Sequence, residues 1–147
     1  MGFKRVLIAN RGEIALRIMR ALRDMGIEAA IIHGREDRLS LPVRMSDVAY
    51  ANYKDNPLDS YLDIESVVAA AKELECDAVH PGYGFLAENA KFVKRLEEEG
   101  ITFIGPASGV ITLLAEKSTR FPIKLFLIRP SFPFKRCLTD FNDLPER

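Results

Sequence analysis

The sequence has few cysteines, no tryptophan and no long hydrophobic run. Cys76 and Cys137 are its only two cysteines, and they lie far apart, with no Cys-x-x-Cys or Cys/His group beside them. A disulfide framework or a zinc site is therefore not expected, and a reducing, cytoplasmic setting fits. No apolar stretch approaches the length that crosses a bilayer, and no signal-peptide pattern follows Met1. We expect neither a membrane span nor export.

An excess of charge of one sign is also absent. The 21 Lys and Arg residues equal the 21 Asp and Glu residues in number, and no basic cluster stands out. This balance argues against a nucleic-acid surface. The turn Asn10-Arg11-Gly12 lacks the spacing G-x-G-x-x-G, and no Walker loop occurs, so no dinucleotide or P-loop site is predicted. No Ser/His/Asp set or pair of facing carboxylates is apparent.

What the sequence does contain is a regular alternation of strand and helix patterns. Its 147 residues, 48% hydrophobic and 29% charged, suit one soluble domain with a real core. We predict strands at 3–9, 27–33, 47–51, 78–80 and 101–105. Helices are predicted at 14–25, 63–74, 89–100 and 108–114. Loops are predicted at 34–42, where a helical turn is the alternative, and at 53–60. Such alternation favours an α/β fold with a doubly wound parallel sheet, flanked by helices.

The first predicted helix has an apolar face and a charged face. The residues predicted to face the core are Ile14, Ile18, Ala21, Leu22 and Met25. On the opposite face, Glu13 and Arg17 form one i,i+4 pair of opposite charge, and Arg20 and Asp24 form another. Such a stripe usually indicates a solvated face; the alternative is a protein–protein interface.

The stretch His80-Pro81-Gly82-Tyr83-Gly84 is the most informative turn in the chain. Gly82 and Gly84 permit backbone angles closed to other residues, and Pro81 keeps His80 out of the helical region. The predicted result is a stiff turn at the carboxyl end of a strand, the edge where open α/β sheets bind ligands. The alternative is a plain strand-to-helix turn with a buried Tyr83. His33 and His80, each at the end of a strand, are more commonly satisfied core-edge histidines than ligands.

Four segments together carry a resemblance to a known family. They are ANRGEIALRI at 9–18, DSYLDI at 59–64, HPGYGFLAEN at 80–89 and FIGP at 103–106. In order and spacing they resemble the amino-terminal domain of biotin carboxylases, the ATP-using components of acetyl-CoA, propionyl-CoA and pyruvate carboxylases. The resemblance runs from about Phe3 to Lys117. It implies a Rossmann-like pre-ATP-grasp domain over residues 1–117.

The resemblance also implies a chemistry and a set of partners. In this family ATP, with Mg or Mn, and bicarbonate give a carboxyphosphate, whose CO2 passes to biotin on a carrier protein and then to a carboxyltransferase. The catalytic groups belong to an ATP-grasp region downstream, so the resemblance assigns no catalytic residue and no metal ligand to this chain.

Five positions match residues with a role in the family. Lys117 matches a lysine that contacts ATP, although Ala115-Glu116 precede it where the family usually has Gly-Asp. Tyr83 and Gly84 match the loop beside biotin and bicarbonate. Arg17 and Arg20 match a helix at the homodimer interface of bacterial relatives, which favours the interface interpretation of the charged stripe.

The segment 118–147 departs from the family. It contains no Ala or Gly after Ser118 and is crowded with Phe and Pro, where the family continues with an Ala-rich helix. We expect it to be poorly ordered. A carboxylase subunit broken near Ser118 by a frameshift or truncation is one interpretation, and a natural tail is the other. A nucleotide- or anion-binding domain that works alone and a dimerisation module also remain open. The final acyl or keto-acid acceptor is not encoded here.

Overall fold

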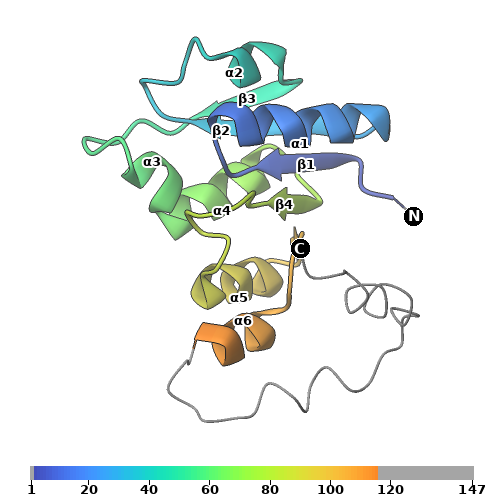
Figure 1. The fold of residues 1–147 in the computed structure, drawn as a ribbon, viewed down its shortest axis with the longest axis vertical. Coiled ribbons are helices and arrows are strands. Elements are labelled where there is room, and N and C mark those ends of the chain that lie inside the picture. Colours follow the sequence, from blue (N-terminus) through green and yellow to red (C-terminus); the bar gives the residue numbers. More distant parts are fainter. Residues whose placement is uncertain (1, 116–147) are drawn as a thin grey trace, which may run out of the picture. The chain divides into compact units, whose positions relative to one another are not determined.

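A five-stranded parallel sheet forms the centre of the computed structural model, which describes residues 2–115. The strands are β1 (Arg5–Ile8), β2 (Glu28–His33), β3 (Val48–Ala51), β4 (Ala78–His80) and β5 (Thr102–Phe103). Their order across the sheet is β3-β2-β1-β4-β5, and every adjacent pair is parallel (Figure 1). The predicted doubly wound α/β fold is confirmed. The predictions for Lys117 and for 118–147 lie outside the described residues.

Helices connect the strands. They are α1 (Gly12–Asp24), α2 (Leu41–Met45), α3 (Asp59–Leu62), α4 (Ile64–Glu73), α5 (Ala90–Glu98) and α6 (Ser108–Ala115). The helix α2 begins inside the segment 34–42, which was predicted as a loop with a possible helical turn, and it has Pro42 in its first turn. The helix α3 was not predicted and begins inside the loop predicted at 53–60. Both are too short, at five and four residues, to show a helical period in the sequence. Asn89 caps α5 as expected, because its side-chain oxygen accepts from the N–H groups of Lys91 and Phe92.

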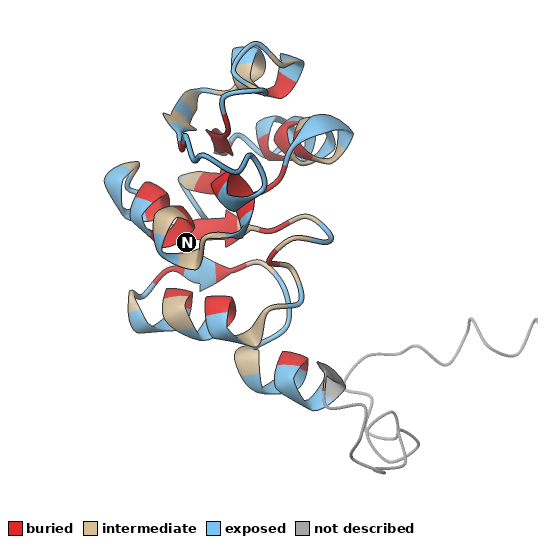
Figure 2. Ribbon diagram, turned by 90° about the vertical axis from the view of Figure 1, so that its left-hand side faces the viewer, coloured by how far each residue is buried: buried red, intermediate tan, exposed pale blue. Residues whose placement is uncertain are grey.

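Side chains alternate between the two faces of the sheet and build two layers of core. Along β1, Val6 and Ile8 pack with Ala15 and Met19 of α1 on one face. Leu7 points to the opposite face, where the core includes the buried side chains of α4 and α5. Figure 2 shows the buried residues concentrated in the strands and on the helix sides that face them. Within residues 2–115, no helix is long and apolar enough to cross a membrane.

The prediction of which face of α1 is buried is wrong, except at Leu22. The structure buries Ala15 and Met19 together with Leu22. By contrast, Met25 is 71% exposed, and Ile14 and Ile18 are only partly buried. The cause is the strand order: α1 connects β1 to β2 and covers that half of the sheet, so among residues 2–115 no helix covers the half over β4 and β5 on this face. The apolar strip predicted for the core instead borders a groove over that open half.

Candidate functional site

The candidate site lies where the direction of winding reverses. From β1 the chain moves through β2 to β3 on one side, and it then crosses to β4 and β5 on the other side. The turns that follow β1 and β4 therefore meet at the carboxyl edge of the sheet, the position where open α/β sheets bind ligands. Residues 81–84 (Pro81-Gly82-Tyr83-Gly84), called here the 81–84 turn, occupy this point after β4.

Asn10 joins these two turns. Its side chain is buried, with the residue 4% exposed. The Asn10 Nδ2 group donates to the carbonyl oxygens of Pro81 (2.8 Å) and Tyr83 (2.9 Å), and Oδ1 accepts from the N–H of Arg11 at 2.9 Å. All of these bonds lie on one amide, so the end of β1 holds the turn after β4. Sequence reasoning did not single out Asn10, although it lies in the ANRGEIALRI segment.

Gly82 is required by both its conformation and its surroundings. Its φ is +66°, in the left-handed region, as is that of Gly84. A Cβ at Gly82 would lie 2.6 Å from Asn10 Nδ2 and 2.8 Å from Ile14 Cγ2, whereas a Cβ at Gly84 would meet nothing within 4 Å. The prediction that these glycines are there for backbone angles agrees with the structure. Gly82 also allows the close approach of Asn10.

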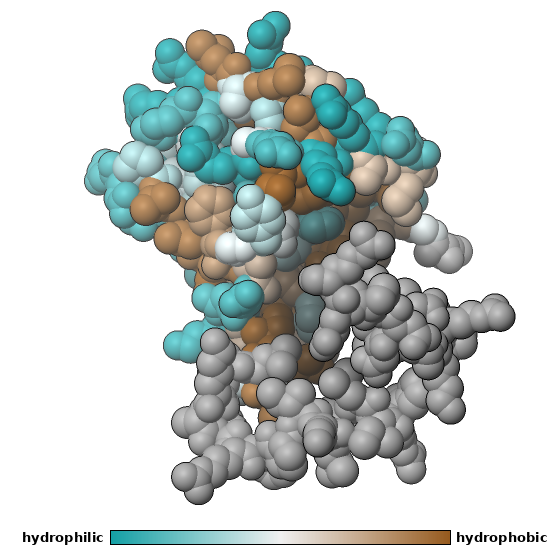
Figure 3. Space-filling model, viewed as in Figure 1, coloured by the Kyte–Doolittle hydropathy of each residue, from teal (hydrophilic) through white to brown (hydrophobic). Residues whose placement is uncertain are grey.

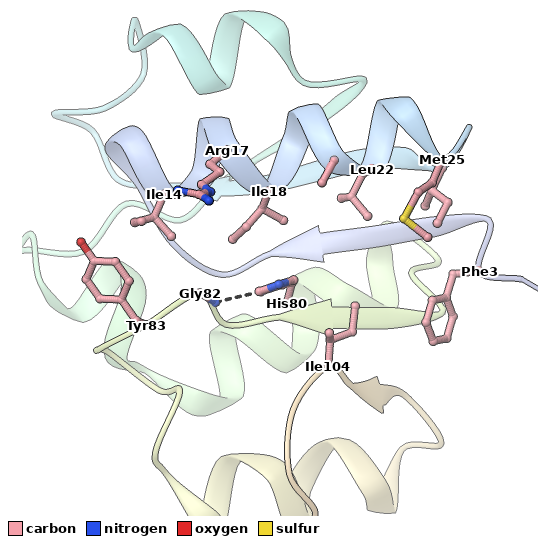
Figure 4. Close-up of a pocket in the computed structure, with 12 residues that line it drawn as sticks. Phe3, Ile14, Arg17, Ile18, Leu22, Met25, His80, Gly82, Tyr83 and Ile104 are labelled. Carbon is pink, nitrogen blue, oxygen red and sulfur yellow. Dashed lines mark hydrogen bonds between the residues drawn. The ribbon is translucent and has the colours of Figure 1, made fainter. Parts of the chain in front are cut away.

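His80 braces the same turn from the side of β4. Its Nδ1 accepts a hydrogen bond from the N–H of Gly82 at 3.0 Å, drawn as the dashed line in Figure 4. A nitrogen that accepts carries no proton, so the neutral imidazole carries its proton on Nε2. Burial lowers the pKa of His80, which also favours the neutral ring. The buried His33 pairs its Nδ1 with the carbonyl oxygen of Gly34 at 2.9 Å, as expected for a satisfied core-edge histidine.

Tyr83 points away from the core. It is 70% exposed, and its side chain stands clear of β4 (Figure 4). Within residues 2–115 its hydroxyl has no hydrogen-bond partner. The alternative of a plain turn with a buried tyrosine is therefore wrong. An exposed aromatic side chain on a braced backbone is typical of a recognition element rather than of a structural one.

A mostly apolar groove of about 540 Å³ runs from Tyr83 along the open half of the sheet. One wall is the apolar strip of α1, and the other includes Ile104 after β5 (Figure 4). Phe3 lies toward the far end, and Arg17 is the only charged residue among those that line it. In Figure 3, the coloured part of the face turned to the viewer shows hydrophobic side chains among hydrophilic ones. The volume and the mostly apolar lining of the groove lie within the range of small-molecule sites, which makes the groove a candidate binding site.

A charged network that sequence reasoning missed supports the neighbouring loops. The Arg11 guanidinium binds both carboxylate oxygens of Asp37 at 2.7 Å, and the Tyr61 hydroxyl donates to Asp37 Oδ2 at 2.6 Å. Burial raises the pKa of Asp37, but these hydrogen bonds outweigh it and hold the pKa below its usual value. Arg11 and Tyr61 lie in recognised segments, but Asp37 lies in a polar loop that carries no signal.

The predicted site residues separate into two groups. Tyr83 lies at the groove together with Arg17, and Gly84 follows Tyr83 in the turn, but Arg20 does not line the groove. The charged stripe of α1 is exposed, and neither of its two predicted i,i+4 pairs forms a salt bridge within residues 2–115. Its residues are Glu13, Arg17, Arg20 and Asp24. The structure therefore brings Tyr83 and Arg17 together and leaves the stripe open to solvent.

The residues that the structure describes contain neither a metal-holding cluster nor a glycine-rich phosphate loop. No group of three or more His, Cys, Asp or Glu side chains within residues 2–115 is arranged to hold a metal. The turn after β1 has one glycine, and Asn10 bridges the crevice beside it, so this turn lacks the glycine-rich loop that wraps a pyrophosphate. Lys117, the predicted ATP contact, lies outside the described residues.

Comparisons with known proteins agree with the fold and with the recognised segments. A family model for the biotin carboxylase N-terminal domain matches residues 2–111. The 2-oxoglutarate carboxylase small subunit of Hydrogenobacter thermophilus is 49% identical over 116 residues, which is 79% of this chain and 24% of that relative. Biotin carboxylase 1 of Bacillus subtilis is 46% identical over 114 residues, 78% of this chain and 25% of that relative.

Solved structures show the same arrangement. The biotin carboxylase domain of a thermophilic 2-oxoglutarate carboxylase bound to bicarbonate superposes with a TM-score of 0.77 at 48% identity, covering 80% of this chain and 26% of that one. A dimer of the Hydrogenobacter thermophilus domain with MgADP, ADP and bicarbonate gives 0.73 at 49% identity, covering 77% and 25%. The chain thus spans about a quarter of these relatives. By its sequence and its fold, it belongs to the family of biotin carboxylase N-terminal domains.

Proposed function

We propose that this chain forms one wall of the active site of an ATP-dependent biotin carboxylase and is not a catalyst by itself. The observation that carries the proposal is the exposed Tyr83 on a turn braced by Asn10 and His80 at the switch point of the sheet. In this proposal Tyr83 and Gly84 face biotin and bicarbonate. Within residues 2–115 no cluster of His, Cys, Asp or Glu side chains is arranged to hold the metal ion that accompanies ATP, which supports the view that the step with ATP belongs to another region of the carboxylase.

The proposal includes the cofactors and partners of the whole carboxylase. These are ATP with Mg or Mn, biotin on a carrier protein, and a carboxyltransferase, in a cytoplasmic setting. Lys117 would contact ATP as a point charge on a phosphate. The domain proposed for this role is 1–117, and 118–147 is proposed as a separate tail. Sequencing across the Ser118 codon tests whether the tail reflects a break. An ATP-grasp sequence in another reading frame supports one, and its absence from all three frames contradicts it.

The first test uses the 147-residue chain alone. Incubated with ATP, Mg, bicarbonate and free biotin, it is expected to release no more phosphate than a Lys117→Ala variant releases. Biotin-dependent phosphate release well above that control would contradict the assignment of a non-catalytic wall.

The second test places the domain in a full-length biotin carboxylase. Residues 1–115 replace the matching segment of the Bacillus subtilis biotin carboxylase 1, which is 46% identical. The chimera is expected to carboxylate free biotin, and Tyr83→Phe is expected to weaken this activity while leaving the thermal midpoint nearly unchanged. Tyr53→Phe is the matched control, because Tyr53 is also exposed, at 46%, but lies beside β3. Equal activity of the two variants would remove Tyr83 from the site.

A dimerisation module is the second candidate, because one observation favours it. Arg17 and Arg20 are exposed on α1 and form no salt bridge within residues 2–115. Unpaired charges of both signs on one helix face suit a two-fold interface, in which each sign meets its opposite on the second copy. The domain dimer of the Hydrogenobacter thermophilus relative supports this candidate. A dimerising role is compatible with the role of Tyr83.

A further inference from the structure

We infer that Asn10 is a positioning residue: its side-chain amide fixes the 81–84 turn and thereby sets where Tyr83 lies. The inference goes beyond the resemblance, which assigned no role to Asn10. The expected effect on substrate rests on the proposed function. That Asn10 fixes the turn follows from the hydrogen bonds alone.

The turn does not determine its own conformation. Two of its four residues are glycines with φ of +66°, and glycine has the most backbone freedom to lose on folding. The Tyr83 side chain is 70% exposed, so packing does not hold it in place either. Whatever orients Tyr83 must therefore act through the backbone on each side of Gly82.

Asn10 acts at those two points. Its Nδ2 group carries two N–H donors, and they bind the carbonyl oxygens of Pro81 and Tyr83, one before and one after Gly82. The bond from the Arg11 N–H to Oδ1 fixes which way the amide faces. The side chain is buried, so water does not compete for these bonds. Asn10 therefore clamps the turn across its most flexible residue.

Gly82 and His80 complete the clamp. The Asn10 amide reaches both carbonyls because Gly82 has no Cβ, which would lie 2.6 Å from Nδ2. On the other side, the N–H of Gly82 donates to His80 Nδ1 at 3.0 Å. The peptide groups around Gly82 are thus held by one side chain from the end of β1 and one from the end of β4. A displacement of this turn would move Tyr83 relative to the residues of α1 and of the segment after β5 that line the groove.

The decisive variant is Asn10→Asp. It keeps the shape of the side chain but replaces both donors with an oxygen, which would face two carbonyl oxygens. Asn52→Asp is the matched control. Asn52 is also buried, at 7% exposed, and its Nδ2 likewise donates to a backbone carbonyl, that of Ser60 at 2.9 Å. Both variants bury a carboxylate at the same edge of the sheet, but only Asn10→Asp releases the 81–84 turn.

Two measurements read out the effect. In the 147-residue chain, amide resonances and hydrogen exchange of Gly82 and Gly84 are expected to change in Asn10→Asp and to stay as in the wild type in Asn52→Asp. In the chimera with the Bacillus subtilis enzyme, Asn10→Asp is expected to lower kcat/KM for biotin by about tenfold or more, since a small misplacement of a binding group has effects of that size. The KM for ATP is expected to change less than about twofold. A merely structural role would not separate the two substrates.

Each outcome has one meaning. If Asn10→Asp matches Asn52→Asp in the turn resonances, or in the kinetics of an active chimera, the inference is overturned. If the wild-type chimera is inactive, the proposed function fails, and the resonances alone decide whether Asn10 holds the turn. Should Asn10→Asp not fold, Asn10→Ala, which removes the donors without burying a charge, takes its place beside Asn52→Ala.

Discussion

At the scale of single residues, Gly82 and Gly84 share one backbone conformation but differ in their surroundings. Substitutions at the two positions therefore separate the cost of backbone strain from the cost of a steric contact. Substitution of either by Ala forces a Cβ into the left-handed region, at a cost of about 1–2 kcal/mol. At Gly82 the new Cβ also meets Asn10 and Ile14, at 2.6 and 2.8 Å, whereas at Gly84 it meets open space. We therefore expect Gly82→Ala to lower the free energy of unfolding by more than Gly84→Ala does.

Urea unfolding of the two variants measures this difference, and Val in place of Ala is expected to enlarge both losses. Equal losses at the two positions would show that the contact with Asn10 relaxes at no cost. Asn10 would then be a less rigid brace than the geometry indicates.

His80 gives a pH dependence with a defined sign. Its pKa is lowered by burial from an ordinary value of about 6.5, so the unfolded chain takes up this proton at a higher pH than the folded chain. The stability that the neutral ring contributes is present above about pH 6.5 and is lost as the pH falls through the folded pKa. Protonation of Nδ1 would also break its bond with the Gly82 N–H. Arg17 of α1 and Tyr83 of the turn are the ionisable groups that share the groove with His80.

We expect the urea midpoint to fall between about pH 6.5 and 5, and His80→Asn to reduce that fall. The Asn side chain has no proton to gain, and its oxygen can still accept from the Gly82 N–H. If the urea midpoint depends on pH equally in the wild type and in His80→Asn, this account is contradicted. The pH dependence then comes from groups other than His80.

At the residue scale, the sequence predicted structure where the residues that determine it are adjacent in the chain. His80, Pro81 and the two glycines predicted a stiff turn at a strand end, and the structure has that turn. Asn10 and Asp37 could not be predicted in the same way, because their partners are distant in the chain. Asn10 binds a carbonyl 73 residues away, and Asp37 binds Arg11 at a separation of 26. No local pattern encodes a contact of that kind.

At the scale of elements, α1 shows why an apolar period does not by itself identify the buried face. The helix has apolar residues around more than half of its circumference, and the period alone cannot tell which strip meets the sheet. The strand order decides it, since α1 lies over β1 and β2 and leaves the adjacent half of the sheet open. The sequence allowed only a helical turn near α2 and did not predict α3, because each holds fewer residues than two helical turns.

Two methionines on this helix test the assignment. Met19 is 0% exposed, whereas Met25, at the carboxyl end of α1, is 71% exposed. We expect Met19→Ala to cost about 2–5 kcal/mol, because it leaves a cavity in the core between α1 and β1. Met25→Ala is expected to change the free energy of unfolding by no more than about 0.5 kcal/mol.

Urea unfolding of Met19→Ala and Met25→Ala measures the two free energies of unfolding and checks the expected difference. A comparable loss for Met25→Ala would mean that Met25 is covered in solution, and that the groove of the 147-residue chain is closed. The strip predicted from the sequence would then face a core after all.

At the scale of the whole molecule, the groove and the exposed Tyr83 lie on the side of the sheet that carries α1. The groove is bordered by the apolar strip of α1, by β4 and by the segment after β5, and Tyr83 stands at its end. Such surface is costly to leave in water, and the chain spans about a quarter of its relatives. The groove and its position beside Tyr83 support the proposed role of the domain as one wall of an active site.

The charged stripe of α1 provides the test at this scale. If Arg17 and Arg20 lie at a two-fold interface, reversing both charges places like charges opposite one another across it, and each such contact opposes association. We expect the wild-type chain to sediment as a dimer at high protein concentration and the double variant Arg17→Glu, Arg20→Glu to sediment as a monomer. Lys91→Glu with Lys94→Glu on α5 is the matched control, since it makes the same change in net charge at two exposed positions. A wild type that stays monomeric, or a control that dissociates equally, would show that the stripe is a solvated face. Raising the salt concentration should weaken a true interface of this kind as well, because exposed ion pairs are screened over about 8–10 Å.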